Sequence, residues 1–362
     1  MLLSSALAND SVEFIEEPTG IVVRYLRPRC RICGLSERFP DADLNLEEVC
    51  KECVNFQTDK AQQNVFWRDR IKSILESSFG GSRYDCVVLF SGGKDSSLAL
   101  LKLRREFDLK VLACTLDNGF LSDIAYQNVG RIVDALEVDH IFIKPNKRLI
   151  TELYRTSLTE PFDDQTVRYS TSACGSCISI VLALGAEEAR MRGAPLMAGG
   201  WTPGQLTHEP IVSGLFLEDI CLRHFGPLRL SSPALANSLE RYLPTRGSFP
   251  PLFNPLYCQQ YKEAEALETL ADFGWQRPND TDSCSTNCRL NGFLVLDHIA
   301  KYGYHPYEYE LTHHVRTGQM SRADAIDKFS RLRVSRAALD LISSALDQKL
   351  PPIVAPFQTR VR

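Results

Sequence analysis

The sequence predicts an α/β fold, in which a doubly wound parallel sheet is joined to an N-terminal zinc ribbon and a helical C-terminal region. Three observations support this prediction: two Cys-x-x-Cys pairs near the start, strand and helix patterns that alternate in the middle, and well-capped helices towards the end. We therefore expect a zinc ribbon at residues 1–60, a sheet domain at 61–237 and a helical region at 238–362.

The composition is that of an ordinary globular protein. The 362 residues are 44% hydrophobic and 24% charged, with a net charge of -4, so the chain has no general basic field for long nucleic acids. A tRNA partner stays open but is not favoured. No apolar run is long enough to cross a bilayer, and the opening MLLSSALAND lacks the basic region of a signal peptide. We therefore expect a cytoplasmic protein whose 12 cysteines serve metal binding, catalysis or burial rather than disulfides.

The first four cysteines have the spacing of a metal site. The sequence CRIC is followed, after sixteen residues, by CKEC. Two such knuckles can place four thiolates around one tetrahedral Zn²⁺, and a closed site of this kind has no open position for catalysis. We predict that the metal folds a segment that has little core of its own. The predicted ligands are Cys30, Cys33, Cys50 and Cys53.

Strands and helices alternate from residue 84 onwards. The predicted strands are 86–90, 110–116, 141–144 and 195–199, and the predicted helices are 97–107, 122–136, 150–157 and 177–192. Strands separated by helices favour a parallel sheet that is covered on both faces. Ligands of such folds bind at the carboxyl ends of the strands.

The sequence SGGKDS lies between the first predicted strand and its helix. Its two glycines allow the backbone to approach a ligand closely. The first N–H groups of the following helix are unsatisfied donors at the positive end of the helix dipole. The segment is therefore predicted to bind phosphate, although its spacing is not that of the Walker motif.

The combination of a strand, SGGKDS, a helix and a second strand ending in LDNGF resembles the PP-loop ATP pyrophosphatases, which have an adenine nucleotide alpha hydrolase-like fold. The resemblance implies that ATP is cleaved between its α and β phosphates and that a carbonyl, amide or carboxylate oxygen of the substrate is adenylated. A nitrogen or sulfur nucleophile then displaces AMP.

The resemblance also implies roles for residues of this chain. Lys94 would neutralise the pyrophosphate and Asp95 would hold Mg²⁺. The sequence WTPGQ stands where that family has a His-Asp pair. The remaining contacts to ATP are implied for Phe90, Ser91, Gly92, Gly93, Ser96, Leu116, Gly199 and Gly200.

A second group of cysteines points to sulfur chemistry. Cys174 and Cys177 lie at the entry to an apolar helix, whose N-terminus favours a thiolate, so we expect them to be reactive or metal-bound rather than two core thiols. Cys284 and Cys288 lie in the polar segment NDTDSCSTNC. A Cys-x-x-Cys pair with one distant cysteine resembles tRNA thiolation enzymes that hold a [4Fe–4S] cluster, which implies Cys174, Cys177 and Cys284 as ligands. Two alternatives stay open. The four thiolates could bind a second zinc, or one cysteine could carry the sulfur as a persulfide.

Other segments resemble the N-acetyl sugar amidotransferases. These segments are the two N-terminal Cys-x-x-Cys pairs, YDCVVLFSGGKDS, VDHIFIKPN, CGSC and the late KYGYHPYEYELTHHVRTGQMSRADA. The resemblance implies replacement of a sugar amide oxygen by ammonia from a partner glutaminase. The tyrosines and histidines of the late segment could bind the substrate by stacking, or they could form an aromatic interface between helices. CSTNC is not a feature that we associate with the sugar enzymes, and it favours sulfur.

We therefore expect an ATP- and Mg²⁺-dependent transferase, with Lys94, Asp95, Cys174 and Cys177 as its catalytic residues. The enzyme would adenylate a carbonyl or amide oxygen of a small-molecule or nucleobase-like substrate and replace that oxygen with sulfur from a donor. The alternatives are the sugar amidotransferase and a nucleotide-binding regulator without catalytic activity. We also expect a homodimer.

Overall fold

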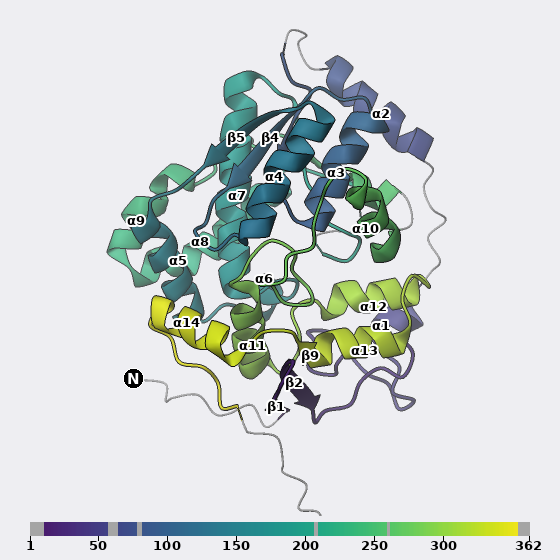
Figure 1. Ribbon diagram of the computed structural model, residues 1–362, viewed down its shortest axis with the longest axis vertical. Helices are drawn as coiled ribbons and strands as arrows, with labels where there is room; N and C mark the ends of the chain where they lie inside the picture. The colour runs from purple at the N-terminus through teal and green to yellow at the C-terminus, as the bar shows by residue number, and fades with distance from the viewer. Residues whose placement is uncertain (1–10, 57–63, 78–81, 206–208, 259–260, 354–362) are drawn as a thin grey trace, which may run out of the picture.

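The computed structural model describes residues 11–56, 64–77, 82–205, 209–258 and 261–353, and a six-stranded sheet forms its centre (Figure 1). The strand order is β5-β4-β3-β6-β8-β7, and all neighbours are parallel except the edge strand β7. The predicted α/β class with a parallel sheet is confirmed. The strands are β3 (Cys86–Leu89), β4 (Val111–Leu116), β5 (Asp139–Ile143), β6 (Leu196–Ala198), β7 (Ile211–Val212) and β8 (Leu252–Phe253).

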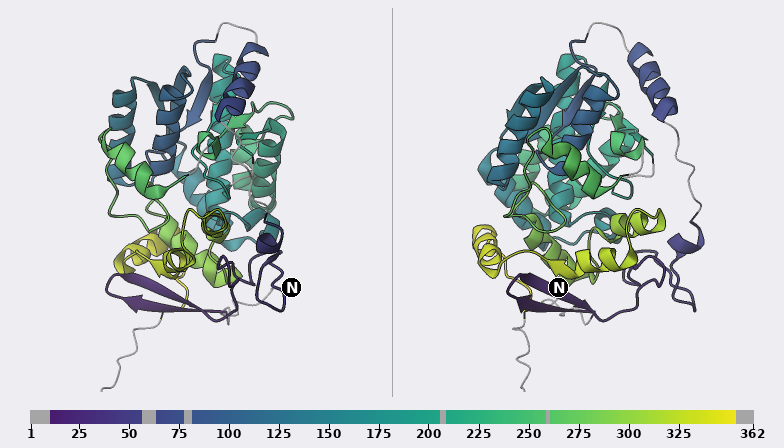
Figure 2. Two further views of the ribbon diagram at one scale, coloured as in Figure 1. Left: turned by 90° about the vertical axis from the view of Figure 1, so that its right-hand side faces the viewer. Right: turned by 45° about the vertical axis from the view of Figure 1, so that its right-hand side comes forward.

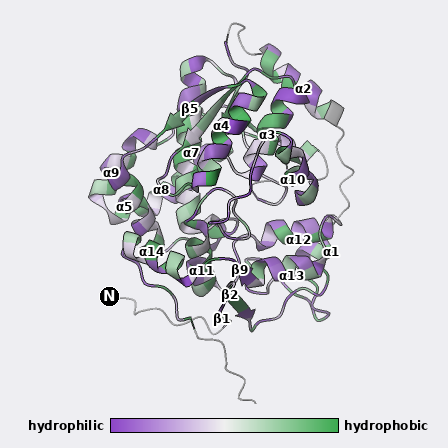
Figure 3. Cartoon of the chain, in the orientation of Figure 1, coloured by the Kyte–Doolittle hydropathy of each residue, from purple (hydrophilic) through white to green (hydrophobic). Residues whose placement is uncertain are grey.

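Helices cover both faces of this sheet. Successive residues of β3 enter different cores: Val87 and Leu89 enter one, and Cys86 and Val88 enter the other. The first core is completed by α5 (Lys147–Thr159) and α7 (Ser172–Arg192), and the second by α3 (Lys94–Arg105) and α4 (Asp123–Leu136). Figure 3 shows hydrophobic and hydrophilic residues alternating along α4, whose apolar side packs on the sheet. The sheet is therefore doubly wound, as predicted.

Helix α7 is the central helix of the first core. By length and composition it could cross a membrane, but 67% of its apolar window is buried inside the protein. It packs against β3, α5 and α8 (Gly214–Ser231). A Cβ at Gly185 would lie 2.3 Å from Leu89 Cδ2, so the glycine allows the helix to pack closely on the sheet. The apolar character of α7 is therefore explained by its place in the core.

The two ends of the described chain meet in a layer beneath the sheet domain (Figure 2). The hairpin of β1 (Val12–Glu17) and β2 (Gly20–Tyr25) pairs with the short strand β9 (Arg331–Leu332). Strand β8, from the predicted C-terminal region, lies inside the central sheet. Strand pairing thus crosses the expected boundaries at residues 60 and 237, and the three-part division stays a prediction. The helices of this layer are α11 (Asn291–Tyr302), α12 (Glu308–Arg316), α13 (Arg322–Ser330) and α14 (Arg336–Leu346).

Most of the predicted elements are present, with shifted ends. The helix expected from residue 177 begins at Ser172, so both of its cysteines lie within its first two turns. Ser122 precedes α4 as predicted, but its hydroxyl donates to Asp280 Oδ1 (2.6 Å) instead of capping the helix. The opening MLLSSALAND lies outside the described residues. The remaining helices are α1 (Lys51–Val54), α2 (Asn64–Ser77), α6 (Asp164–Val167), α9 (Pro233–Leu239), α10 (Glu263–Ala271) and two short 3₁₀ turns at 240–242 and 255–258.

Candidate active site

The SGGKDS loop connects β3 directly to α3. Gly92 has a φ of +72°, and a Cβ there would lie 2.3 Å from the carbonyl oxygen of Ala125, so only glycine fits between the loop and α4. The hydroxyls of Ser91 and Ser96 lie 3.1 Å apart and close the turn. Gly93 occupies the N-cap position of α3 without a side-chain cap. The loop therefore places the N-terminus of α3 at the carboxyl end of β3, as predicted for a phosphate site.

Lys94 and Asp95 form an ion pair in the first turn of α3. Lys94 Nζ lies 2.7 Å from Asp95 Oδ2, and the Tyr261 hydroxyl donates to Asp95 Oδ1 at 2.5 Å. Burial alone would lower the pKa of Lys94, but the charge of Asp95, aided by Tyr261 and Glu263, raises it well above its usual value. Lys94 is therefore a permanent cation at the loop. Tyr261 was missed by sequence reasoning, because it reaches the loop from 166 residues away and no motif surrounds it.

The glycine pair after β6 contacts the same turn of α3. A Cβ at Gly200 would lie 2.5 Å from Ser96 N, and a Cβ at Gly199 would lie 2.1 Å from the Trp201 ring. Both glycines thus lie at the carboxyl end of the strand next to β3. Phe90 and Leu116 lie at the ends of β3 and β4. The structure therefore gathers all the predicted ATP contacts at neighbouring strand ends, and their roles stay predictions.

The WTPGQ segment is fixed by a buried carboxylate of α12. Glu310 accepts hydrogen bonds from the Thr202 hydroxyl (2.6 Å) and the Gln205 amide (2.9 Å). Burial alone would raise the pKa of Glu310, but hydrogen bonding and charge from His314, together with Thr202, lower it to about 2. Glu310 was not singled out from the sequence, because only the folded chain brings α12 beside this segment.

The CSTNC segment lies directly against the SGGKDS loop. The Lys94 backbone N–H donates to Thr286 Oγ1 at 2.9 Å, and the Ser122 N–H donates to the carbonyl oxygen of Asn287 at 2.8 Å. The Trp275 indole N–H donates to the carbonyl oxygen of Gly92 at 2.9 Å. The segment from Trp275 to Asn287 therefore contacts both the loop and the start of α4.

Asn118 of the LDNGF motif lies between cysteines from two distant parts of the chain. Its Nδ2 is 3.9 Å from Cys177 Sγ and 3.8 Å from Cys288 Sγ. The Tyr154 hydroxyl donates to Cys177 Sγ at 3.2 Å. Cys174, one turn before Cys177, donates to Asn291 Oδ1 at 3.6 Å. The structure thus brings Cys288 next to the Cys174–Cys177 pair.

Cys284, the third ligand expected from the sequence, lies further along the same segment. Its sulfur is 4.0 Å from the Ser283 hydroxyl, and its backbone N–H donates to Asp282 Oδ1 at 2.7 Å. Burial raises the pKa of the thiols at Cys174 and Cys177, and it raises that of Cys284 to about 12. The favoured thiolate that we expected from the helix N-terminus is therefore offset by burial in the metal-free protein.

The N-terminal cysteines have the geometry of a single-metal site. A tetrahedron with Zn–S bonds of about 2.3 Å requires sulfur atoms about 3.8 Å apart. The Cys30–Cys53 and Cys33–Cys50 sulfur pairs are separated by 3.7 and 3.6 Å, and all four sulfurs lie within 4.8 Å of one another. The four residues therefore fit Zn²⁺. Among the described residues, Cys174, Cys177, Cys284 and Cys288 form no group as tight as this one.

The aromatic segment that follows α11 packs against this cysteine cluster. The Phe39 ring contacts Tyr304 edge-on and Tyr309 face-on, with ring centroids 5.2 and 5.6 Å apart. The Arg316 guanidinium donates to Cys33 Sγ at 3.5 Å. Of the two interpretations of this segment, the contacts favour an aromatic helix interface.

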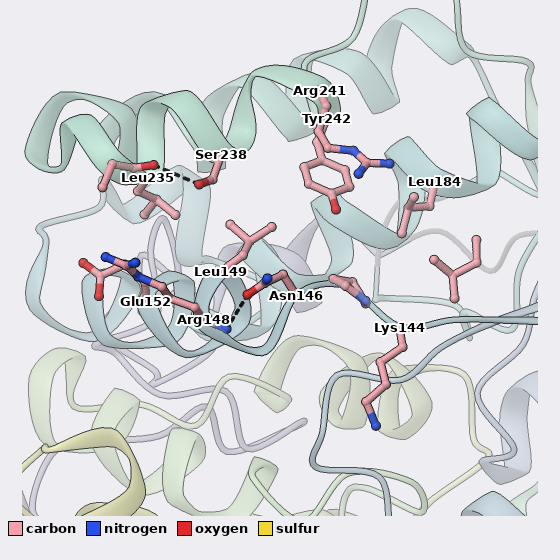
Figure 4. Close-up of a pocket in the computed structure, with 13 residues that line it drawn as sticks. Lys144, Asn146, Arg148, Leu149, Glu152, Leu184, Leu235, Ser238, Arg241 and Tyr242 are labelled. Carbon is pink, nitrogen blue, oxygen red and sulfur yellow. Dashed lines mark hydrogen bonds between the residues drawn. The ribbon is translucent and has the colours of Figure 1, made fainter.

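A separate open groove lies beside α5 and α9 (Figure 4). Its volume is about 560 Å³, and its charged lining residues are Lys144, Arg148, Arg241 and Glu152. Lys144 is paired with Asp117 at 2.7 Å. The groove contains none of the residues predicted to bind ATP or metal.

Comparisons with known proteins give one distant relative and several solved structures. No family model matches the chain. An uncharacterized protein of Methanocaldococcus jannaschii is 23% identical over 310 residues, which are 85% of this chain and 95% of the relative.

Several solved structures are also similar to the chain. The U34-tRNA thiolase NcsA of Methanococcus maripaludis, with its [4Fe-4S] cluster, is 13% identical over 83% of this chain and 89% of that chain, with a TM-score of 0.36. NMN synthetase of Francisella tularensis is 11% identical over 80% and 98%, with a TM-score of 0.36. NH3-dependent NAD synthetase of Campylobacter jejuni is 18% identical over 39% of this chain and 56% of that chain, with a TM-score of 0.30.

Proposed function

We propose that this protein uses ATP and Mg²⁺ to adenylate a carbonyl or amide oxygen of its substrate and then replaces that oxygen with sulfur. The observation that carries the proposal is the hydrogen bond between the Lys94 N–H and Thr286. It links the phosphate loop to the CSTNC segment, and Cys288 of that segment lies with Cys177 around Asn118. The candidate nucleotide site and a group of half-buried thiols therefore adjoin each other.

In the first step the substrate oxygen attacks the α-phosphorus of ATP, and pyrophosphate leaves. The N–H groups at the start of α3 and the Lys94 ammonium would stabilise the charge of the leaving pyrophosphate. Asp95 would hold Mg²⁺, which supplies further neutralisation of the phosphates. Both Asp95 oxygens already accept a hydrogen bond, and a carboxylate has lone pairs beyond these two, so the residue fits this role.

In the second step a sulfur nucleophile attacks the activated carbon. The C–O bond breaks, and AMP leaves with the former substrate oxygen. Cys174, Cys177 and Cys288 would hold a [4Fe–4S] cluster, which supplies an open iron site for sulfide. In this proposal Cys288 takes the place of Cys284, the third ligand expected from the sequence. Tyr154 and Asn118 direct donors at the Cys177 sulfur, which reduces the rise in the pKa of this thiol that burial causes. The sulfide itself must come from a donor.

The N-terminal cysteines are proposed to bind a structural Zn²⁺. Support comes from the sulfur separations of 3.7 and 3.6 Å and from the burial of Cys30, Cys33 and Cys50. Hydrogen bonds among the four thiols lower the pKa of Cys30 and raise those of Cys50 and Cys53, so the binding of zinc would release the protons that these thiols keep.

The nucleotide chemistry is tested by measuring the release of AMP and pyrophosphate from ATP in the presence of candidate substrates. We expect Lys94→Met to reduce this release about a hundredfold or more, because the loop loses its cation. Lys102→Met is a matched control, since Lys102 lies on the same helix and pairs with Glu106 away from the loop. Equal rates for the two variants would refute the assignment of the loop.

The sulfur chemistry is tested by purifying the protein without oxygen and measuring iron, acid-labile sulfide and zinc. We expect about four irons per chain, lost in Cys174→Ala and Cys288→Ala and retained in Cys221→Ala, a buried cysteine outside the group. Loss of iron in Cys284→Ala but not in Cys288→Ala would restore the ligand set expected from sequence. One zinc without iron, in a protein that still releases pyrophosphate, would exclude a cluster.

A further inference from the structure

The open groove beside α5 and α9 has an apolar floor. Leu149, Leu184 and Leu235 line it, and each of these side chains is at least nine-tenths buried. The volume of about 560 Å³ is that of a small-molecule site, and such sites are lined mostly by apolar side chains with a few polar groups. A ligand of this groove should therefore have an apolar body.

One hydroxyl group is directed into the groove. Tyr242 is 5% exposed and lines the groove, yet its hydroxyl has no hydrogen-bond partner among the described residues. Figure 4 shows its ring extending from the turn after α9 towards Asn146 on the opposite wall. A tyrosine hydroxyl usually has a partner when the residue is buried, so this O–H is available to donate to a ligand.

The charged side chains around the groove are mostly cationic. Together with a hollow that shares Arg148 and Glu152 with it, the groove is lined by one carboxylate, that of Glu152, and by the cations Lys144, Lys147, Arg148, Arg155 and Arg241. Lys144 is paired with Asp117, whereas Arg148 and Arg241 form no ion pair within the described part of the chain. Helix α5 also begins here, with the positive end of its dipole. In a protein with a net charge of -4, this region should attract anions.

The combination of apolar floor, hydroxyl and cations narrows the class of ligand. Inorganic phosphate would leave the leucines of the floor uncovered, and a neutral apolar molecule would leave the arginines without a partner. An RNA backbone would contact the exposed arginines but would bring no apolar group to the floor. A donated O–H forms its strongest hydrogen bond with a charged acceptor. A small molecule that joins an anionic group to an apolar body satisfies all three features.

We propose that this groove is a second binding site of the protein and that its ligand is a small organic anion, either a carboxylate or a phosphate ester with an apolar body. The Tyr242 hydroxyl would donate to the anionic group, and Arg148 and Arg241 would neutralise its charge. The apolar body would cover Leu149 and Leu235. The proposal is independent of the proposed function, because the groove contains none of the residues predicted to bind ATP or metal.

The first test measures the fluorescence of 8-anilinonaphthalene-1-sulfonate, an aromatic anion, during titration of the full chain. We expect the double variant Arg148→Gln, Arg241→Gln to bind this anion about tenfold more weakly, and Tyr242→Phe, which keeps the ring, about fivefold more weakly. Arg105→Gln is the matched control, because Arg105 is an exposed arginine at the far end of α3. Unchanged binding in both groove variants, or an equal loss in the control, would overturn the proposal.

The second test identifies the class of ligand by displacement of the bound fluorescent anion. We expect 4-phenylbutyrate or phenyl phosphate to displace it, and the stronger of the two assigns the ligand as a carboxylate or a phosphate ester. The neutral 4-phenylbutyramide and inorganic phosphate should each act at least about tenfold more weakly. Equal displacement by the amide or by inorganic phosphate would overturn the proposal. Displacement by poly(uridylic acid) and by neither small anion would overturn it in favour of a surface for nucleic acid.

Discussion

One side chain beside the loop binds a backbone N–H that is predicted to bind phosphate. Thr286 accepts the Lys94 N–H, an amide that the proposed reaction would direct at ATP. The hydroxyl therefore competes with phosphate for the same donor. This makes Thr286 a residue at which stability and affinity for ATP should change in opposite directions.

We predict that Thr286→Val lowers the free energy of unfolding by about 1 kcal/mol and tightens ATP binding about fivefold. The variant leaves the Lys94 N–H unpaired in the free protein, while bound phosphate restores its partner. Denaturant unfolding and calorimetry measure the two effects. Thr286→Ser keeps the hydroxyl and should resemble the natural protein, whereas weaker ATP binding by the valine variant would contradict the argument.

Glu310 gives a prediction about pH. Its pKa is lowered to about 2 in the folded protein, despite burial, by His314 and Thr202. A carboxyl with a depressed pKa stabilises the fold above its unfolded pKa of about 4.3, and this contribution is lost as the pH falls towards the folded value. The free energy of unfolding should therefore decrease between about pH 4.5 and 2, and Glu310→Gln should lose less over that interval. A steeper fall in the glutamine variant would contradict this assignment.

At the scale of elements, the sequence predicted the features that depend on neighbouring residues. It did not predict the features that depend on contacts with distant residues. The apolar runs of β3 and β4 were recognised because each is short, buried and followed by a turn. Ser321 and Ser335 cap their helices through their hydroxyls, and they are the caps of the helices that the sequence predicts near its end. Ser122 does not, because Asp280, 158 residues away, binds its hydroxyl.

The candidate site shows the same limit. The SGGKDS loop is continuous in sequence, so a motif sufficed to locate it. The choice between Cys284 and Cys288 depends on how a polar segment crosses the loop, and the spacing of the cysteines carries no such information. Tyr261 and Glu310 reach the site only through the packing of α12 and the chain after β8.

Helix α12 links the N-terminal cysteine cluster to the candidate active site. Tyr309 packs on Phe39 beside the N-terminal cysteines, and the next residue, Glu310, binds the WTPGQ segment.

We predict that Cys50→Ala abolishes binding of one zinc, lowers the unfolding midpoint and weakens ATP binding, because the WTPGQ segment is displaced. Cys258→Ala, another buried cysteine, should retain zinc. An unchanged midpoint in the zinc-free variant would show that the metal does not support this layer.

At the scale of the whole molecule, a buried ion pair joins the N-terminal segment to α12. Arg29 Nη2 lies 2.7 Å from Glu308 Oε1, and the two side chains are 10% and 0% exposed. The guanidinium also lies over the Tyr25 ring, at 3.9 Å from its centroid. Glu308 in turn accepts the backbone N–H of Ser36 at 3.0 Å. The N-terminal segment and α12 should therefore unfold as one unit.

We predict that Arg29→Ala lowers the free energy of unfolding by about 3 kcal/mol or more, because it leaves the Glu308 carboxylate buried without its cation. Arg24→Ala is the matched control, because it breaks an exposed ion pair. The side chains of Arg24 and Glu13 are 65% and 48% exposed, so the free energy of unfolding should fall by less than about 1 kcal/mol. Urea unfolding followed by both circular dichroism and tryptophan fluorescence measures the difference. Equal effects of the two substitutions would contradict the prediction. A transition that splits in two for Arg29→Ala alone would show that this pair couples the lower layer to the sheet domain.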